Sequence, residues 1–96
     1  MDRIDRFRIF TRVVECASFT RAADQLGLPR STVSAAIAEL EQRLGTRLLQ
    51  RSTRRVSTTH DGDVFHARCL RLIAEVEETD VATLVAIGGV DRPNLS

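Results

Sequence analysis

Apolar residues recur at steps of three and four along residues 2–17, with charged residues between them. The apolar positions are Ile4, Phe7, Phe10, Val13, Val14 and Ala17. This periodicity places them on one face of a helix, and Asp2 stands where an N-cap is needed. The pattern predicts an amphipathic helix from Asp2 to Ala17.

Two shorter helices are predicted between this helix and residue 45. Ser18 and Thr20 can each cap the first, which ends at Gly27, where a residue with positive φ allows a sharp turn. The second spans roughly residues 31–44 and is closed by Gly45.

Ala23, Gly27 and Val33 have the spacing of a helix-turn-helix motif. Ala23 is small enough for two helices to cross closely, and Gly27 makes the turn. Val33 and Ile37 lie one turn apart on the inner face of the later helix, where they fill the wedge between the two helices. A helix-turn-helix lays its second helix in the major groove of DNA. A helical hairpin in a core is the alternative for so short a pattern.

The periodicity changes after Gly45. Residues 47–51 and 55–59 are short runs rich in apolar or β-branched side chains, and residues 52–54 separate them. Short runs of this kind around a polar turn predict a two-stranded hairpin. Beside a helix-turn-helix, such a hairpin is a wing that can touch the DNA backbone or the minor groove.

Residues 61–87 contain no proline and predict the longest helix, which ends before two glycines. Its apolar stripe is wider than one small bundle can cover, so we expect part of it to pack on the first helix and part on a second copy of the chain. The expected dimer contacts are Phe65, Cys69, Leu72 and Val76. A helix covered entirely by its own domain is the alternative.

Together these elements predict a mainly α fold. Residues 1–60 are expected to form a winged helix-turn-helix domain that binds DNA, with a three-helix bundle and a two-stranded wing. Residues 61–87 are expected to form a linker and dimerisation helix. Residues 88–96 begin with two glycines and contain Pro93, a composition typical of a hinge toward a further domain.

The net charge of +1 conceals an uneven distribution. Residues 1–60 hold eleven arginines and six acidic residues, whereas residues 61–96 hold three and seven, so the two parts carry +5 and −4. Residues 42–60 contain five arginines and no acidic residue, a density that suits phosphate contacts. With four Phe and no Trp or Tyr, the chain has few rings on which the bases of single strands or RNA can stack. Double-stranded DNA is the expected partner.

The predicted recognition helix supplies the first group of candidate DNA contacts. Such a helix meets the groove with its N-terminal residues. Base-edge or phosphate contacts are therefore expected from Arg30, Ser31, Thr32, Ser34 and Ala35, which lie on its outer face or in its first turns. One hydroxyl, that of Ser31 or Thr32, is expected to be used as the helix cap.

The supporting helix and the wing supply the remaining candidates. Thr20 and Arg21 lie at the start of the supporting helix, where backbone N–H groups also attract anions, and should approach phosphates. Arg51, Arg54 and Arg55 are placed on the wing for contacts to the backbone or minor groove.

An enzyme hypothesis rests on two small clusters. His66 and Cys69 share a helical face, and a Cys–His pair can activate a thiolate. His60 with Asp61 and Asp63 could hold a metal. Neither set is accompanied by a second ligand cluster or an oxyanion-hole loop. We therefore expect no enzyme, no metal and no cofactor.

Cys16 and Cys69 lie far apart in predicted helices, without a CxxC motif or a secretory signal. They are typical of small core residues in a reducing compartment. No apolar run approaches the length of a membrane span, so no membrane contact and a cytoplasmic location are expected.

A larger set of residues forms a combination far more specific than the helix-turn-helix spacing. It comprises Phe10, Val14, Ser18-Phe19-Thr20-Arg21-Ala22-Ala23, Leu26, Ser34, Ile37, Leu40-Glu41, Leu44-Gly45, Leu48, Arg51, Arg54, Thr59 and Gly62. Through these residues the chain resembles the N-terminal DNA-binding domain of LysR-type transcriptional regulators. The resemblance implies a bacterial, nucleoid-associated regulator with a dimerising linker helix. It also implies a C-terminal domain that binds a small-molecule effector and is absent from this chain, which is then expected to be a fragment or truncated product.

The chain departs from the family pattern at functional positions. Ala35 and Ala36 stand where many members have Arg and Gln, so base contacts there are expected to be apolar, as with a thymine methyl, or missing. Arg30 places a donor suited to guanine at the start of the recognition helix. The usual Leu and Ala at the start of the linker helix are lost, although Thr59 remains as a cap.

The combined prediction is sequence-specific binding of double-stranded DNA by a homodimer, with a tetramer as an open alternative for the full-length protein. A helical dimerisation module without DNA binding is the alternative function. That alternative leaves the arginine cluster unexplained.

Overall fold

The computed structural model describes residues 2–52 and 55–86, and these residues form four helices and one hairpin. The elements in chain order are α1 (Arg3–Cys16), α2 (Phe19–Leu26), α3 (Arg30–Leu44), β1 (Leu49–Arg51), β2 (Val56–Thr58) and α4 (His60–Ala86). The prediction of a mainly α fold with a hairpin before a long last helix is confirmed.

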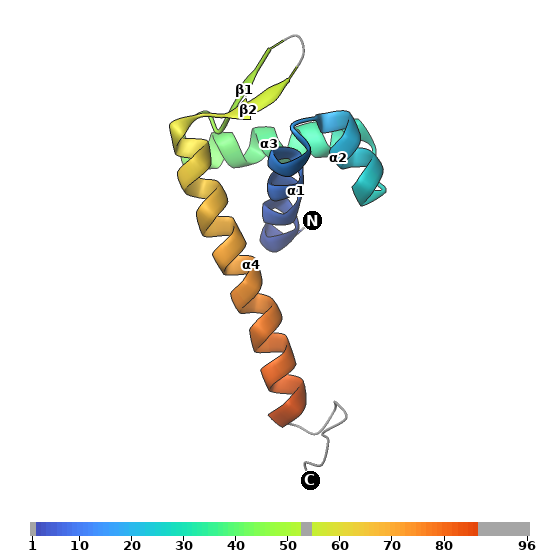
Figure 1. The fold of residues 1–96 in the computed structure, drawn as a ribbon, viewed down its shortest axis with the longest axis vertical. Coiled ribbons are helices and arrows are strands. Elements are labelled where there is room, and N and C mark those ends of the chain that lie inside the picture. Colours follow the sequence, from blue (N-terminus) through green and yellow to red (C-terminus); the bar gives the residue numbers. More distant parts are fainter. Residues whose placement is uncertain (1, 53–54, 87–96) are drawn as a thin grey trace.

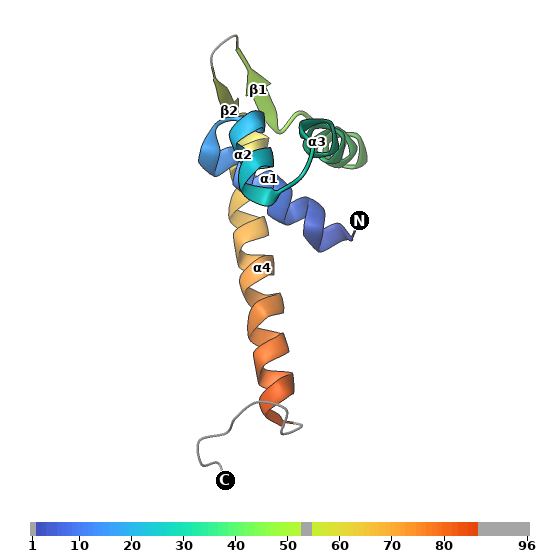
Figure 2. The same cartoon turned by 90° about the vertical axis from the view of Figure 1, so that its right-hand side faces the viewer.

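The hairpin and α4 extend in opposite directions from the bundle that α1, α2 and α3 form (Figure 1). The view from the side shows the hairpin above the bundle and α4 running down past α1, with its far end well away from the hairpin (Figure 2). A partner that binds at the hairpin end of the molecule would therefore leave most of α4 uncovered (Figure 2).

The core is centred on α1. Phe10, Val13 and Ile37 have no exposed surface. The ring of Phe65 in α4 lies 5.3 Å from that of Phe10 and 5.7 Å from that of Phe7, in tilted and edge-on arrangements that aromatic pairs favour. The predicted packing of part of the α4 stripe on the first helix is confirmed.

Cys69 belongs to this core and has no exposed surface. The expectation that it contacts a second chain was wrong, because position 69 follows Phe65 by one helical turn and both face α1. The prediction that it is a small core residue is confirmed. Burial raises the pKa of its thiol from 9.0 to about 12. Cys16 is half-buried, and both cysteines are free.

The ends of α2 follow the predicted chemistry. The hydroxyl of Ser18 accepts a hydrogen bond from the backbone N–H of Arg21 at 3.1 Å, so Ser18 is the N-cap and Thr20 lies exposed within the first turn. Gly27, with φ 69°, ends the helix in the left-handed region, and Gly45 ends α3 with the same φ.

The start of α3 differs from the prediction. Pro29 is the N-cap, and its carbonyl accepts hydrogen bonds from the N–H groups of Thr32 and Val33 at 3.0 and 3.2 Å. The helix therefore begins at Arg30, and the expectation that a hydroxyl of Ser31 or Thr32 caps it was wrong. The physical reason is that proline occupies the N-cap position and its side chain has no hydrogen-bonding atom, so no side-chain cap forms there.

The hairpin is antiparallel, with Leu49 paired to Thr58 and Arg51 to Val56. Its strands have three residues each and are shorter than predicted, and α3 binds the backbone at the start of β1. The carboxylate of Glu41 accepts hydrogen bonds from the N–H groups of Leu48 and Leu49 at 2.9 and 3.2 Å.

The first turn of α4 closes onto the base of the hairpin. The N–H of Thr59 donates to the Leu48 carbonyl at 3.0 Å. The hydroxyl of Thr59 donates to the Arg47 carbonyl at 2.7 Å and accepts from the N–H of Gly62 at 2.9 Å, as expected of a cap. A Cβ at Gly62 would lie 2.0 Å from the Leu48 carbonyl oxygen, so the two backbones meet only because position 62 has no side chain.

We expect Gly62→Ala to destabilise the chain by about 2 kcal/mol or more, because the added methyl cannot be accommodated beside a backbone oxygen. Helix propensity alone predicts the opposite sign, since alanine is favoured over glycine by about 1 kcal/mol in a helix. Thermal and urea unfolding followed by circular dichroism measure the difference. Ala67→Gln, which enlarges an exposed position of the same helix, is the control and should stay within about 0.5 kcal/mol of wild type. A more stable Gly62→Ala protein would contradict the close contact.

The Cys69 thiol is expected to resist alkylation below pH 9 in the folded chain, because its raised pKa keeps it protonated. The folded pKa lies above the unfolded value, so the unfolded chain loses this proton first and stability should fall as pH rises from about 9 to about 12. Mass spectrometry after iodoacetamide treatment of the Cys16→Ser variant isolates Cys69. Rapid native alkylation, or an unchanged alkaline slope in Cys69→Ala, would contradict the assignment.

Candidate nucleic-acid interface

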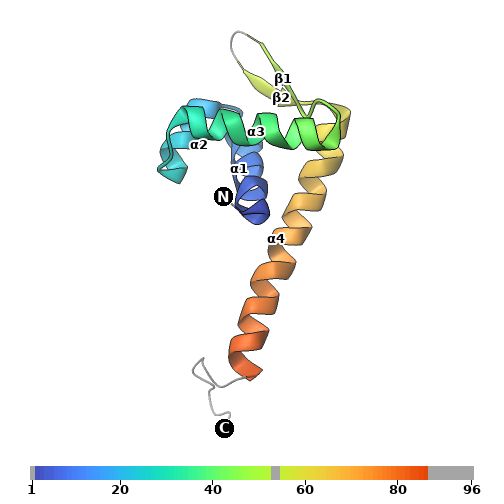
Figure 3. The same cartoon turned by 180° about the vertical axis from the view of Figure 1, so that it is seen from behind.

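Much of the outer face of α3 is uncovered by the other described elements (Figure 3). Figure 3 shows α3 lying across the outside of the molecule, below the hairpin. Val33, Ile37 and Leu40 face the core and are buried, while Ser31 and Ala35 are exposed one turn apart. This is the geometry expected of a helix that enters a groove.

The predicted contact residues at the start of α3 lie close together, but they differ in solvent exposure. Arg30, Ser31 and Ala35 are exposed, whereas Thr32 and Ser34 are half-buried. Because neither hydroxyl in the first turn is used as a cap, the side chains of Ser31 and Thr32 are both available for contacts outside the helix.

Arg30 and Arg51 come from different elements and share one aromatic neighbour. The guanidinium carbon of Arg51 lies 4.6 Å from the ring centroid of Phe19, and that of Arg30 lies 5.8 Å from it. Phe19 is the first residue of α2 and is 4% exposed. These contacts place the start of α2, with the exposed Thr20 and Arg21, beside the start of α3.

Sequence reasoning missed the role of Phe19. A phenylalanine after a helix cap is typical of a core residue, and nothing in its own neighbourhood marks it as a partner for arginines. Its two partners lie far along the chain, so only the folded arrangement reveals the contact.

Two hairpin arginines border the same region. Arg51 ends β1 and Arg55 precedes β2, and both are exposed. The hairpin turn is held by hydrogen bonds from the N–H of Ser52 to the Arg55 carbonyl at 2.9 Å and from the N–H of Arg55 to the Ser52 hydroxyl at 3.1 Å. Arg54, the third predicted wing contact, lies outside the described residues.

Positive charge in this region is not neutralised by neighbouring carboxylates. Among the described side chains, those of residues 2–52 and 55–78, no ion pair involves Arg21, Arg30, Arg51 or Arg55, although Arg8 pairs with Glu77. A surface of uncompensated guanidinium groups attracts polyanions.

Glu39 marks the limit of the basic surface and was also missed from the sequence. It lies on the outer side of α3 with Ser31 and Ala35, where a shallow depression forms. Its carboxylate binds Arg6 at 2.9 Å and lies 4.0 Å from Arg43. The negative charge is therefore offset by two arginines, one of them from α1.

Three side chains of the enzyme hypothesis, those of Asp61, Asp63 and Cys69, have structural roles instead. The carboxylate of Asp61 accepts a hydrogen bond from the Thr46 hydroxyl at 2.6 Å, and that of Asp63 accepts from the Thr58 hydroxyl. Cys69 is a buried, protonated thiol and no nucleophile. Across the described part of the chain, no three His, Cys, Asp or Glu side chains are grouped to hold a metal. None of the described helices is both long and apolar enough to cross a membrane.

The expected dimer contacts divide between two environments. Phe65 is half-buried against α1, while Leu72 and Val76 are 40% and 38% exposed. Leu72 lines an apolar groove between the end of α3 and α4, together with Leu44 and Val64, which are 47% and 53% exposed.

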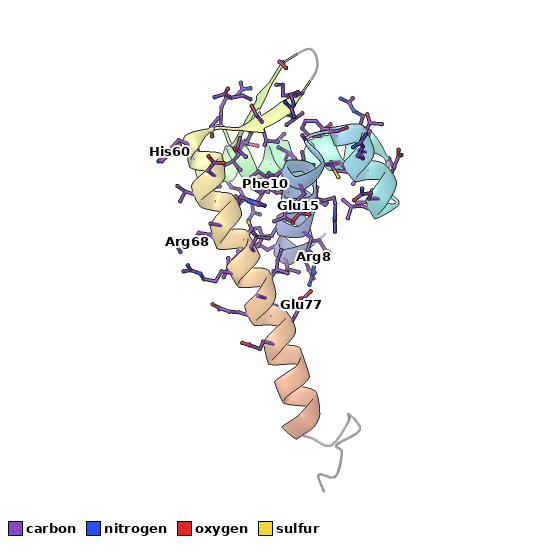
Figure 4. The ribbon with its side chains drawn as sticks, in the orientation of Figure 1. Arg8, Phe10, Glu15, His60, Arg68 and Glu77 are labelled. Atoms are coloured by element: carbon purple, nitrogen blue, oxygen red, sulfur yellow. The ribbon has the colours of Figure 1, made fainter. Side chains whose placement is uncertain are left out.

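On the side of α4 toward α1, an exposed ion pair joins the two helices. Arg8 and Glu77 face each other there, with the two charged groups 3.1 Å apart (Figure 4). Exposed pairs of this kind contribute little to stability.

The chain was compared with known families, curated proteins and solved structures. The family described as bacterial regulatory helix-turn-helix protein, lysR family, matches residues 4–63. An HTH-type transcriptional repressor of Pseudomonas aeruginosa (strain UCBPP-PA14) is 46% identical over 97% of this chain and 28% of its own length. An HTH-type transcriptional regulator of Xanthomonas campestris pv. campestris (strain 8004) is 53% identical over 77% of this chain and 22% of its own length.

A solved structure extends the likeness to the fold. The crystal structure of the BenM_DBD/benA site 1 DNA complex matches with a TM-score of 0.86 and 36% identity, over 94% of this chain and 100% of that chain. The chain spans about a quarter of the length of its curated relatives, which are transcriptional regulators and not enzymes. The match over residues 4–63, which is more than half of the chain, shows that this chain belongs to the LysR family of bacterial regulatory helix-turn-helix proteins.

Proposed function

We propose that the chain binds double-stranded DNA in a sequence-specific manner, as the DNA-binding part of a bacterial transcriptional regulator. The observation that carries the proposal is the exposed start of α3 beside arginines that no carboxylate neutralises within the described residues. The similarity to the BenM_DBD/benA site 1 DNA complex supports it.

The candidate residues divide into those that contact bases and those that contact phosphates. Arg30 and Ser31 contact base edges at the start of α3, and Ala35 meets an apolar group such as a thymine methyl. Arg55 and Arg21 contact phosphates from the hairpin and from α2. Phosphate contacts fix the orientation of the protein, while base contacts distinguish one sequence from another.

Residues 1–60 are the proposed DNA-binding domain and residues 61–87 the proposed dimerisation helix. Residues 88–96, the predicted hinge toward an effector-binding domain, lie outside the described ranges. A small-molecule effector, the nucleoid location and the tetramer stay predictions. A dimerisation module without DNA binding is not favoured, because it gives the exposed arginines no partner.

We also infer a homodimer formed through α4. Leu72 and Val76 lie one turn apart on the exposed side of α4, and the groove beside Leu44 continues this apolar surface. Burial of such side chains favours association by removing apolar area from water. Two copies joined in this way present two recognition helices to neighbouring half-sites.

We expect the full chain to bind a labelled duplex in fluorescence anisotropy measurements, with an affinity that falls steeply as salt rises. On a site selected from genomic fragments, Arg30→Ala should cost about 1–3 kcal/mol and relax the preference at one base pair. Arg55→Ala should weaken all sequences alike and lower the salt slope by about 1. Arg71→Ala, at an exposed position on α4, is the matched control and should bind as wild type. Absence of binding at low salt would overturn the proposal.

We expect Leu72→Glu and Val76→Glu each to shift the chain toward monomer at concentrations where wild type is dimeric, because each places a charge in the apolar interface. Sedimentation equilibrium across a concentration series measures the shift. Leu70→Glu makes the same change on another side of α4, where the side chain is 45% exposed, and should leave the dimer intact. A wild-type chain that stays monomeric at high concentration would contradict the interface.

A further inference from the structure

The ring of Phe19 is the meeting point of three elements of the candidate interface. Phe19 begins α2, Arg30 begins α3 and Arg51 ends β1. Both guanidinium groups lie close to this one ring, at 5.8 and 4.6 Å from its centroid. A cation near an aromatic face is attracted by the negative potential of the ring.

The ring itself is held in place. It is 4% exposed and belongs to the core, and the Ser18 cap fixes the backbone of the turn in which it stands. The N–H of Val56 in β2 donates to the Ala17 carbonyl at 3.4 Å, which ties the hairpin to the chain just before Phe19. The backbone just before Phe19 is therefore hydrogen-bonded to β2 of the hairpin.

An aromatic ring and a carboxylate can both hold an arginine side chain, but only the carboxylate neutralises its charge. Glu39 holds Arg6 at 2.9 Å and offsets its charge. Phe19 restricts Arg30 and Arg51 but carries no charge of its own, so both arginines keep their full attraction for an anion. Long arginine side chains otherwise lose much rotational freedom when they bind.

We propose that Phe19 is a positioning residue that holds the guanidinium groups of Arg30 and Arg51 in place before DNA arrives, so that α3 and the hairpin meet the duplex as one unit. This inference rests on the proposed DNA-binding function. It assigns Phe19 no contact with DNA, since its ring is covered by its own chain.

The test replaces the ring by an aliphatic side chain of similar hydrophobicity. Phe19→Leu should bind a selected genomic site about three- to tenfold more weakly than wild type, because two cation–ring contacts are lost. Its salt slope should stay at the wild-type value, since both arginines still reach the DNA, whereas Arg51→Ala should lower the slope by about 1. Phe7→Leu is the matched control, with the same change at a partly buried ring that packs on Phe65, and should bind as wild type.

A second measurement needs no DNA. In the wild-type chain labelled with ¹⁵N, the Arg51 Nε–Hε signal should be shifted upfield by the ring and show less fast motion than that of Arg55. Phe19→Leu should remove both effects. In the DNA-binding assay, the loss of affinity caused by Arg51→Ala should be smaller in the Phe19→Leu background than in wild type. The wild-type part of this measurement stays decisive if Phe19→Leu fails to fold.

The two proposals fail in different ways. If the wild-type chain does not bind DNA, the proposed function is overturned, while the ¹⁵N measurements still decide whether the ring restricts the arginines. If wild type binds and a folded Phe19→Leu protein binds equally well, the positioning role is overturned. An Arg51 side chain as mobile as that of Arg55 in wild type also overturns it.

Discussion

The backbone of Leu48 is the point on which the arrangement of the molecule depends. Its N–H is bound by the Glu41 carboxylate of α3 at 2.9 Å, and its carbonyl accepts the N–H of Thr59 at 3.0 Å. Gly62 of α4 then lies against the same carbonyl. One peptide segment thus connects the recognition helix, the hairpin and the long helix. The position of the hairpin relative to α3 and the direction in which α4 leaves the bundle are set by the same contacts.

Charge is organised around this framework in two ways. Away from the candidate interface, arginines such as Arg6 and Arg8 pair with carboxylates and connect α1 to α3 and α4. At the interface, Arg30 and Arg51 lie over an uncharged ring. The overall charge of the chain is close to neutral, yet the side that faces the proposed partner keeps its attraction for phosphates.

Much of the fold was predictable because it depends on local patterns. Helical periodicity, the two left-handed glycines and the Ser18 cap each act within a few residues. The N-cap of α3 was missed because Pro29 occupies that position without a side-chain hydrogen bond, whereas the sequence offered the hydroxyls of Ser31 and Thr32 as caps. The placing of Cys69 among the dimer contacts was wrong because periodicity defines an apolar stripe but not which neighbour covers each part of it. The partners of Phe19 depend on how distant elements pack, which spacing along the chain does not encode.

The short contact between α4 and the hairpin base also gives α4 the mechanics of a lever. The helix has 27 residues and is therefore about 40 Å long, and among the described residues it is held near its N-terminal end, by its first turn on the hairpin base and by Phe65 and Cys69 in the core with α1. A tilt of about 5° at the held end displaces the far end of such a rod by about 3.5 Å. A poorly fitting side chain at position 62 would therefore do more than lower stability. It would also change the direction in which α4 leaves the bundle, and with it the position of the far end of the helix.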